Sequence, residues 1–235
     1  MKNIIIASTS TLHNGSYLEY LLPELQTFFA QCNEIVFIPF ARPSGISHDH
    51  YTQKVKDVFS QINIAVKGIH EFEDPIKALE NAKGIFTGGG NTFLLVSQLY
   101  KRNIIDTLEK VVKNGTPYLG TSAGSNICGL TMNTTNDMPI VYPPSFRTLG
   151  FVSFNINPHY LDPIAGSTHM GETRETRINE FHKFNPQPVV GLREGSWLAV
   201  KGSSIKLKGN LTARIFKRNE TPFEVVSETE LNDLK

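Results

Sequence analysis

Short apolar runs alternate with segments of helical periodicity through the first half of the chain, and this alternation constrains the fold most strongly. β-branched and aromatic residues dominate the runs, whereas the segments between them repeat apolar residues three or four positions apart. A β-α-β-α order implies a mostly parallel sheet with helices on both faces. The expected strands are 4–7, 35–38, 64–66, 85–86 and 118–119, and the expected helices are 17–29, 48–62, 75–79, 92–100 and 104–113.

The pattern changes after Gly150. One helix is expected over 172–184, followed by strands at 189–192, 197–200 and 205–207, with a turn at 201–204 between the last two. These strands predict an antiparallel edge on the parallel sheet rather than a second domain. The fold class is therefore three-layer α/β, with a single domain over 1–235. The polar end, 227–235, is expected to fray.

The balance of charge excludes several classes of partner. The 235 residues hold 23 Lys and Arg against 22 Asp and Glu, a net charge of +1, which argues against nucleic-acid and membrane binding. Cys32 and Cys128 form no C-x-x-C pair, so neither a disulfide framework nor a zinc site is indicated. The apolar start stops at Ser8, too early for a signal peptide, and no run reaches the ~18 residues of a membrane helix. We expect a cytoplasmic protein.

The segment 120–124 reads Gly-Thr-Ser-Ala-Gly and lies between an expected strand and an expected helix. G-x-S-x-G in this place is typical of a nucleophile elbow, in which small neighbours permit a strained turn that exposes the Ser122 hydroxyl. The free N–H groups at the helix start would face a developing oxyanion. An ordinary Gly/Ser-rich loop is the alternative, because the motif is short.

A serine nucleophile needs a base and a group that orients the base. Among the seven histidines, His159 follows a short strand and Pro158, so it is expected at the carboxyl end of a strand; His169 is the reserve candidate. Asp137 lies among small polar residues that could keep a carboxylate ionised. The predicted triad is Ser122, Asp137 and His159, in the chain order of α/β-hydrolases. The alternative for Asp137 is an Asx-turn before Pro139.

The glycine run 88–90 follows another expected strand and has two interpretations. It could hold a phosphate or a flavin on backbone N–H groups, or it could supply half of an oxyanion hole. It matches neither G-x-G-x-x-G nor a P-loop. The elbow needs a second donor from a neighbouring strand's loop, which favours Gly89 and Gly90 together with Ala123 as the oxyanion hole.

Together these segments resemble the peptidase E, or α-aspartyl dipeptidase, family. The resemblance is carried by residues 36–41, 88–93, 120–124, 134–141, 155–159, 171–175 and 191–197, so it extends over nearly the whole chain. It implies a cytoplasmic serine peptidase that cleaves dipeptides with N-terminal aspartate, with a fold like class I glutamine amidotransferases and Ser in place of their Cys. It carries the catalytic roles to Ser122, Asp137 and His159. No metal and no cofactor are expected, and the chain should be a monomer or a homodimer.

The matched segments also supply candidates beyond the triad. Glu194 is the alternative triad acid, while Asn91 and Arg174 are expected to bind the substrate. A cation is needed because a buried substrate carboxylate is costly to desolvate without one. Thr121 and Ser125 depart from the family pattern, flank the nucleophile and could alter the pocket. The alternatives are a related peptidase of β-aspartyl or cyanophycin-type specificity and a flavodoxin-like phosphate-binding module; Arg177 and Arg193 are rival cations.

Overall fold

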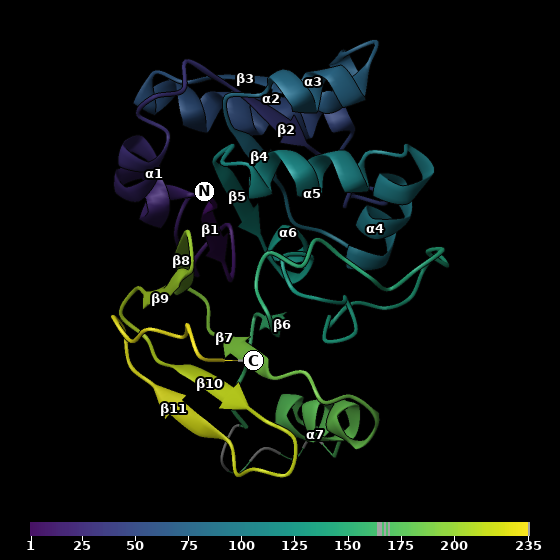
Figure 1. Ribbon diagram of the computed structural model, residues 1–235, viewed down its shortest axis with the longest axis vertical. Helices are drawn as coiled ribbons and strands as arrows, with labels where there is room; N and C mark the ends of the chain where they lie inside the picture. The colour runs from purple at the N-terminus through teal and green to yellow at the C-terminus, as the bar shows by residue number, and fades with distance from the viewer. Residues whose placement is uncertain (164–165, 167, 169, 235) are drawn as a thin grey trace.

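A seven-stranded sheet occupies the upper part of the molecule in Figure 1. The computed structural model describes residues 1–163, 166, 168 and 170–234. The strand order is β3-β2-β4-β5-β1-β8-β9. The first five strands are parallel to one another, whereas β8 pairs antiparallel with β1, and β9 pairs antiparallel with β8. The strands are β1 (Asn3–Ala7), β2 (Glu34–Ile38), β3 (Ala65–Gly68), β4 (Ile85–Thr87), β5 (Tyr118–Thr121), β8 (Trp197–Lys201) and β9 (Ser204–Lys208). The expected parallel sheet with an antiparallel edge is confirmed.

Helices cover both faces of this sheet, as the alternation of strand side chains requires. Ile4 and Ile6 of β1 pack in one apolar cluster with α3, α4, α5 and α6, whereas Ile5 and Ala7 pack in another with α1 and α2. None of the helices within the described residues is long and apolar enough to cross a membrane. Their bounds are α1 (Leu22–Phe28), α2 (His48–Phe59), α3 (Pro75–Asn81), α4 (Thr92–Lys101), α5 (Ile105–Lys113) and α6 (Ala123–Asn126), with short 3-10 turns at Glu19–Leu21, Ser60–Ile62 and Ile69–Glu71.

A second sheet of four strands, in the order β11-β10-β7-β6, lies below the first and beside α7 (Arg174–Phe184) (Figure 1). Its strands are β6 (Asn155–Pro158), β7 (Val189–Leu192), β10 (Ala213–Phe216) and β11 (Phe223–Val225). The expectation that 189–192 would join the edge of the main sheet is therefore wrong. β7 pairs parallel with β6 and antiparallel with β10, and its four residues are all buried. Ile156, Val190 and Ile215 belong to the same apolar cluster as Ile4, so the two sheets share one core.

The end of the chain does not fray over the residues that the structure describes. The Glu228 and Leu231 N–H groups donate to the carbonyl oxygens of Leu207 and Ile205 in β9, each at 2.8 Å. Leu231 and Leu234 are buried. The tail thus covers the free side of β9, which the polar composition of the segment did not indicate.

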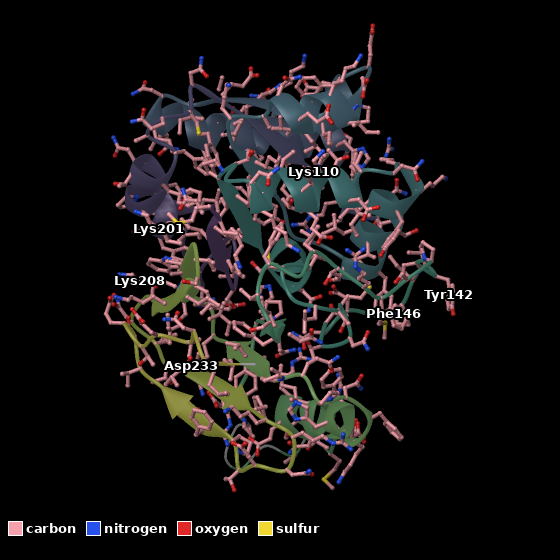
Figure 2. The ribbon with its side chains drawn as sticks, in the orientation of Figure 1. Lys110, Tyr142, Phe146, Lys201, Lys208 and Asp233 are labelled. Atoms are coloured by element: carbon pink, nitrogen blue, oxygen red, sulfur yellow. The ribbon has the colours of Figure 1, made fainter. Side chains whose placement is uncertain are left out.

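A long connection, residues 127–154, joins α6 to β6 and carries apolar side chains at the surface. Tyr142 is 91% exposed and Phe146 is 43% exposed, and Tyr142 lies at the right-hand edge of the molecule in Figure 2. The connection passes the start of α4, where the Asn91 amide donates to the Met138 carbonyl at 2.9 Å. It therefore borders the carboxyl edge of the parallel strands.

Candidate active site

Ser122 lies on the sharp turn between β5 and α6, as the sequence predicts. Its φ of 54° and ψ of −111° lie in a region that costs a residue other than glycine about 1–3 kcal/mol. Both glycines of the motif are required by close backbone contacts. A Cβ on Gly120 would lie 2.4 Å from the Gly124 carbonyl oxygen, and one on Gly124 would lie 2.2 Å from that of Thr87. The turn therefore permits no side chain at either position.

Three polar side chains meet in a line at this turn. The Nε2 atom of His159 lies 2.8 Å from the Ser122 hydroxyl, and its Nδ1 atom lies 2.5 Å from Oε1 of Glu194. His159 follows β6 with a φ of 53°, and Glu194 lies in the loop between β7 and β8. With the proton on Nδ1, the imidazole donates to Glu194 and accepts from Ser122. This is the tautomer that a general base acting on a serine requires.

Asp137 makes no hydrogen bond to His159 in the described part of the chain, and the structure places its carboxylate at the start of α4. Its Oδ2 atom accepts hydrogen bonds from the N–H and the hydroxyl of Thr92, at 2.7 and 2.6 Å, and from the Thr135 hydroxyl at 3.0 Å. The carboxylate thus caps the first turn of α4, where an anion is favoured by free N–H groups and the helix dipole. Glu194, the alternative acid, occupies the position beside Nδ1.

Asn91 is the N-cap of α4. Its side-chain oxygen accepts from the Leu94 N–H at 3.0 Å, and its amide nitrogen donates to the Met138 carbonyl. Both ends of the amide are therefore engaged within the protein. The expected contact of Asn91 with substrate remains a prediction, whereas its capping role was visible in the sequence as Asn before a helical segment.

The glycine loop after β4 packs directly against Ser122. A Cβ on Gly89 would lie 2.9 Å from the Ser122 Cβ atom and 3.4 Å from its hydroxyl oxygen. Within the described part of the chain, no acceptor receives the N–H groups of Gly89, Gly90 or Ala123. The turn and the loop thus bring free backbone donors beside Ser122, which is the chemistry that an oxyanion hole needs.

The two departures from the family pattern lie close to Ser122 in the chain. Thr121 and Ser125 are both fully buried. The Ser125 hydroxyl lies 2.6 Å from the Ala7 carbonyl oxygen and 2.7 Å from that of Gly120. These side chains therefore act on the packing that supports the turn.

Arg174 is the first residue of α7 and lines a small cavity of about 50 Å³ together with Asn157 and Arg177. Burial lowers the pKa of the Arg174 guanidinium, Arg177 lowers it further, and Asp137 acts in the opposite direction. The guanidinium stays charged and makes no ion pair within the described residues. His169, the reserve base, lies outside the described residues.

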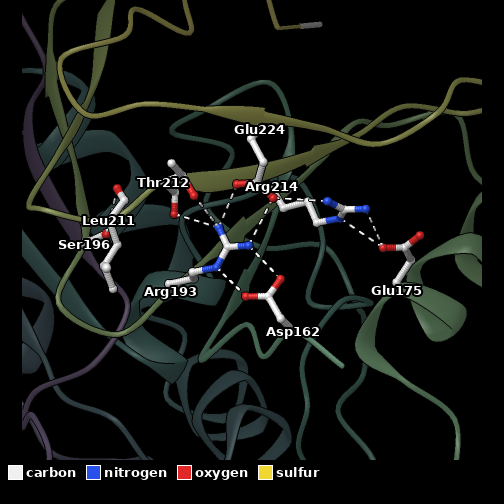
Figure 3. Close-up of polar contacts among 8 residues, drawn as sticks. All are labelled: Asp162, Glu175, Arg193, Ser196, Leu211, Thr212, Arg214 and Glu224. Carbon is white, nitrogen blue, oxygen red and sulfur yellow. Dashed lines mark hydrogen bonds and ion pairs between the residues drawn. The ribbon is translucent and has the colours of Figure 1, made fainter. Parts of the chain in front are cut away.

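Arg193, a rival cation, is fully engaged in a network with other charged side chains (Figure 3). Its guanidinium donates to both oxygens of Asp162, at 2.7 and 2.8 Å, and to both oxygens of Glu224, at 2.8 and 3.0 Å. Arg214 continues the network from Glu224 to Glu175 at the start of α7. The network joins the residue before Glu194 to the helix that carries Arg174. It leaves Arg193 no free donor for a ligand carboxylate.

Burial acts to raise the pKa of Glu224, but hydrogen bonds from Arg193, Thr212 and Arg214 outweigh it and lower that pKa to about 2. Hydrogen bonds from Arg193 also lower the pKa of Asp162, against a smaller effect of burial. Both carboxylates are therefore held in their charged form.

Comparisons with known proteins match nearly the whole chain. The sequence model of peptidase family S51 matches residues 4–208. Peptidase E of Streptomyces coelicolor is 47% identical over 99% of this chain and 94% of its own length. A Drosophila melanogaster protein named probable alpha-aspartyl dipeptidase is 44% identical over 92% of this chain and 90% of its own. The crystal structure of a peptidase from an acI-B1 Actinobacterium has the same fold, with a TM-score of 0.72 at 13% identity over 98% of this chain and 96% of that one.

Proposed function

The chain belongs to peptidase family S51, and from this premise we propose that it is a serine dipeptidase that cleaves dipeptides with N-terminal aspartate through Ser122, His159 and Glu194. The observation that carries the proposal is the line of contacts from the Ser122 hydroxyl through the His159 imidazole to the Glu194 carboxylate. The name of the Drosophila relative supports the aspartyl substrate.

The geometry supports a two-step acyl transfer. The Ser122 oxygen attacks the peptide carbonyl carbon while its proton passes to Nε2 of His159, and Glu194 stabilises the imidazolium that forms. The N–H groups of Ala123 and of Gly89 or Gly90 then hold the tetrahedral oxyanion. His159 returns the proton to the leaving amine as the C–N bond breaks. Water next attacks the acyl-enzyme while His159 takes its proton, and His159 returns that proton to the Ser122 oxygen as the ester C–O bond breaks and aspartate leaves.

Arg174 is our candidate for binding the side-chain carboxylate of the substrate aspartate. It stands at the first turn of α7, where free N–H groups and the helix dipole also favour an anion. Its charge is partly buried beside the cavity, so it can pair with a carboxylate at low dielectric. Arg193, in contrast, already binds two carboxylates.

A panel of dipeptides tests the proposal. We expect Asp-Xaa to be hydrolysed with a much higher kcat/KM than Glu-Xaa or Asn-Xaa, and Ser122→Ala to lose activity by several orders of magnitude because triad members act as a unit. The rate should fall in acid, since a protonated imidazole cannot accept the serine proton. Preferred cleavage of β-linked aspartyl substrates would instead indicate the related specificity, and undiminished activity of Ser122→Ala would exclude a serine mechanism.

We further propose a cytoplasmic location. Cys32 and Cys128 are free thiols and both are buried, a pattern that suits a reducing compartment. Fractionation of cells with an antibody against the chain would test it, and recovery outside the cytoplasm would contradict it.

A further inference from the structure

The triad side chains are carried by three segments that are far apart in sequence, and two of them have unfavourable backbone conformations. Ser122 and His159 both have φ near +55°, although neither is a glycine. Such conformations persist where the surrounding structure fixes them. Contacts from the end of β1 hold both Ser122 and His159.

The end of β1 contacts all three of these segments. The Ala7 carbonyl accepts from the Ser122 N–H at 3.2 Å. The next residue, Ser8, accepts from the His159 N–H at 2.9 Å and donates its hydroxyl proton to the Leu192 carbonyl at 2.7 Å. The Ser8 N–H donates to the Ser196 carbonyl at 3.1 Å, so Ser8 holds the chain on both sides of Glu194.

The Ser8 hydroxyl donates one hydrogen bond, to the Leu192 carbonyl, and accepts one, from the His159 N–H. β6 and β7 pair in register as far as Pro158 and Leu192, and His159 then leaves the ladder with its positive φ. The hydroxyl bridges the two strand ends at this point. Ser8 is fully buried, so bulk water does not reach its hydroxyl. Without the hydroxyl, the His159 N–H would lose its acceptor in a dry environment.

We propose that Ser8 is a positioning residue for the triad, whose hydroxyl fixes the His159 backbone and the strand end leading to Glu194. The imidazole then reaches Ser122 and Glu194 at the same time. Ser8 touches none of the reacting atoms, so it acts through His159 and not on the substrate. This inference rests on the proposed function, because it presumes that the three side chains work as a triad.

The test compares Ser8→Ala with Thr148→Val. Thr148 is also buried, and its hydroxyl donates to the Gly129 carbonyl at 2.7 Å, outside the site. Both variants lose one buried hydroxyl that bonds to a backbone carbonyl. We expect Ser8→Ala to lower kcat for Asp-Xaa at least tenfold with KM changed less than twofold, while Thr148→Val keeps kcat within twofold. The melting temperature of each variant is measured alongside.

A spectroscopic readout separates positioning from general stability. We expect the proton on Nδ1 of His159, bonded to Glu194, to give a far-downfield proton NMR signal, which is assigned by its loss in Glu194→Gln. We expect Ser8→Ala to shift or broaden this signal and Thr148→Val to leave it unchanged. If Ser8→Ala fails to fold, Ser8→Cys, which keeps the side-chain size but is a weak hydrogen-bonding group, takes its place with the same expected results.

Labelling of Ser122 by an organophosphorus fluoride, followed by mass spectrometry, does not depend on the choice of peptide. Slower labelling in Ser8→Ala supports the inference even where Asp-Xaa is not the substrate, whereas absent labelling of wild-type Ser122 overturns the proposed function itself. A folded Ser8→Ala or Ser8→Cys with unchanged kcat, labelling rate and His159 signal would show that Ser8 has no positioning role.

Discussion

At the scale of single residues, the proposal depends on which carboxylate, Glu194 or Asp137, orients His159. Glu194→Gln should lower kcat about 10⁴-fold, because an amide favours the wrong imidazole tautomer and cannot stabilise an imidazolium. Asp137→Asn should cost far less activity, since that carboxylate contacts Thr92 and Thr135 instead. Steady-state kinetics on one Asp-Xaa substrate checks both, and the opposite ranking would return the role to Asp137.

Arg174 carries the prediction for specificity. Arg174→Met should remove a charged hydrogen bond worth about 1.5–3 kcal/mol. We expect a drop of about 10- to 150-fold in kcat/KM for Asp-Xaa, with little change for a poor neutral substrate such as Asn-Xaa. Arg177→Met tests the rival cation on the next turn of α7, where Arg177 pairs with Glu172 at 3.7 Å. Equal losses on both substrates would mean that Arg174 supports the fold.

The sequence could locate Ser122 and His159, the proposed nucleophile and base, more readily than Glu194, the proposed acid. Ser122 can be recognised from its neighbours in the sequence, because Gly120 and Gly124 lie so close to other backbone atoms that no side chain fits there. Glu194 has none, since it meets His159 across a separation of 35 positions from a loop in another part of the chain. Asp137 looked suitable because its neighbours bind a carboxylate, and they do so in order to cap a helix.

At the scale of elements, that cap predicts a loss of stability. Asp137→Asn weakens three hydrogen bonds to a charged oxygen at the start of α4, so the free energy of unfolding should fall by about 1–3 kcal/mol. Urea unfolding followed by circular dichroism measures it, with Glu194→Gln as the comparison. An equal or greater loss in Glu194→Gln would contradict the capping role.

Helices and strands differed in how well the sequence predicted them. α3 was evident because Asp74 caps it and Pro75 opens it, and the Asp74 carboxylate accepts from the Ile76 and Lys77 N–H groups at 3.0 Å. The second sheet was not evident. β6 reads Asn-Ile-Asn-Pro, with side chains that bond to neighbouring loops, so it lacks the apolar pattern of a buried strand.

At the scale of the whole molecule, the Arg193 network predicts how stability depends on pH. The folded-state pKa of Glu224 is about 2, below its ordinary value of 4.5, so the unfolded chain binds more protons between these values. The stabilising contribution is complete above pH 4.5 and is lost as the pH falls toward 2. Solvent screening limits its size, because the Glu224 side chain is 37% exposed.

Chemical unfolding at pH 3 and pH 6 tests this dependence. Glu224→Gln should reduce the difference in unfolding free energy between the two conditions, since the amide does not titrate. The same pH difference in wild type and Glu224→Gln would show that the network does not link folding to pH.

The placement of the three side chains of the proposed triad on segments from both sheets has a consequence for the chain as the ribosome makes it. Synthesis runs from the N-terminus, so the strands that present Ser122 emerge before β6, β7 and the Glu194 loop. A partly made chain, or one ended early by a nonsense mutation before residue 194, lacks Glu194 even when all five parallel strands have been made. Hydrolysis should therefore switch on late in translation, and prematurely terminated products should be inert toward the dipeptide pool of the cell.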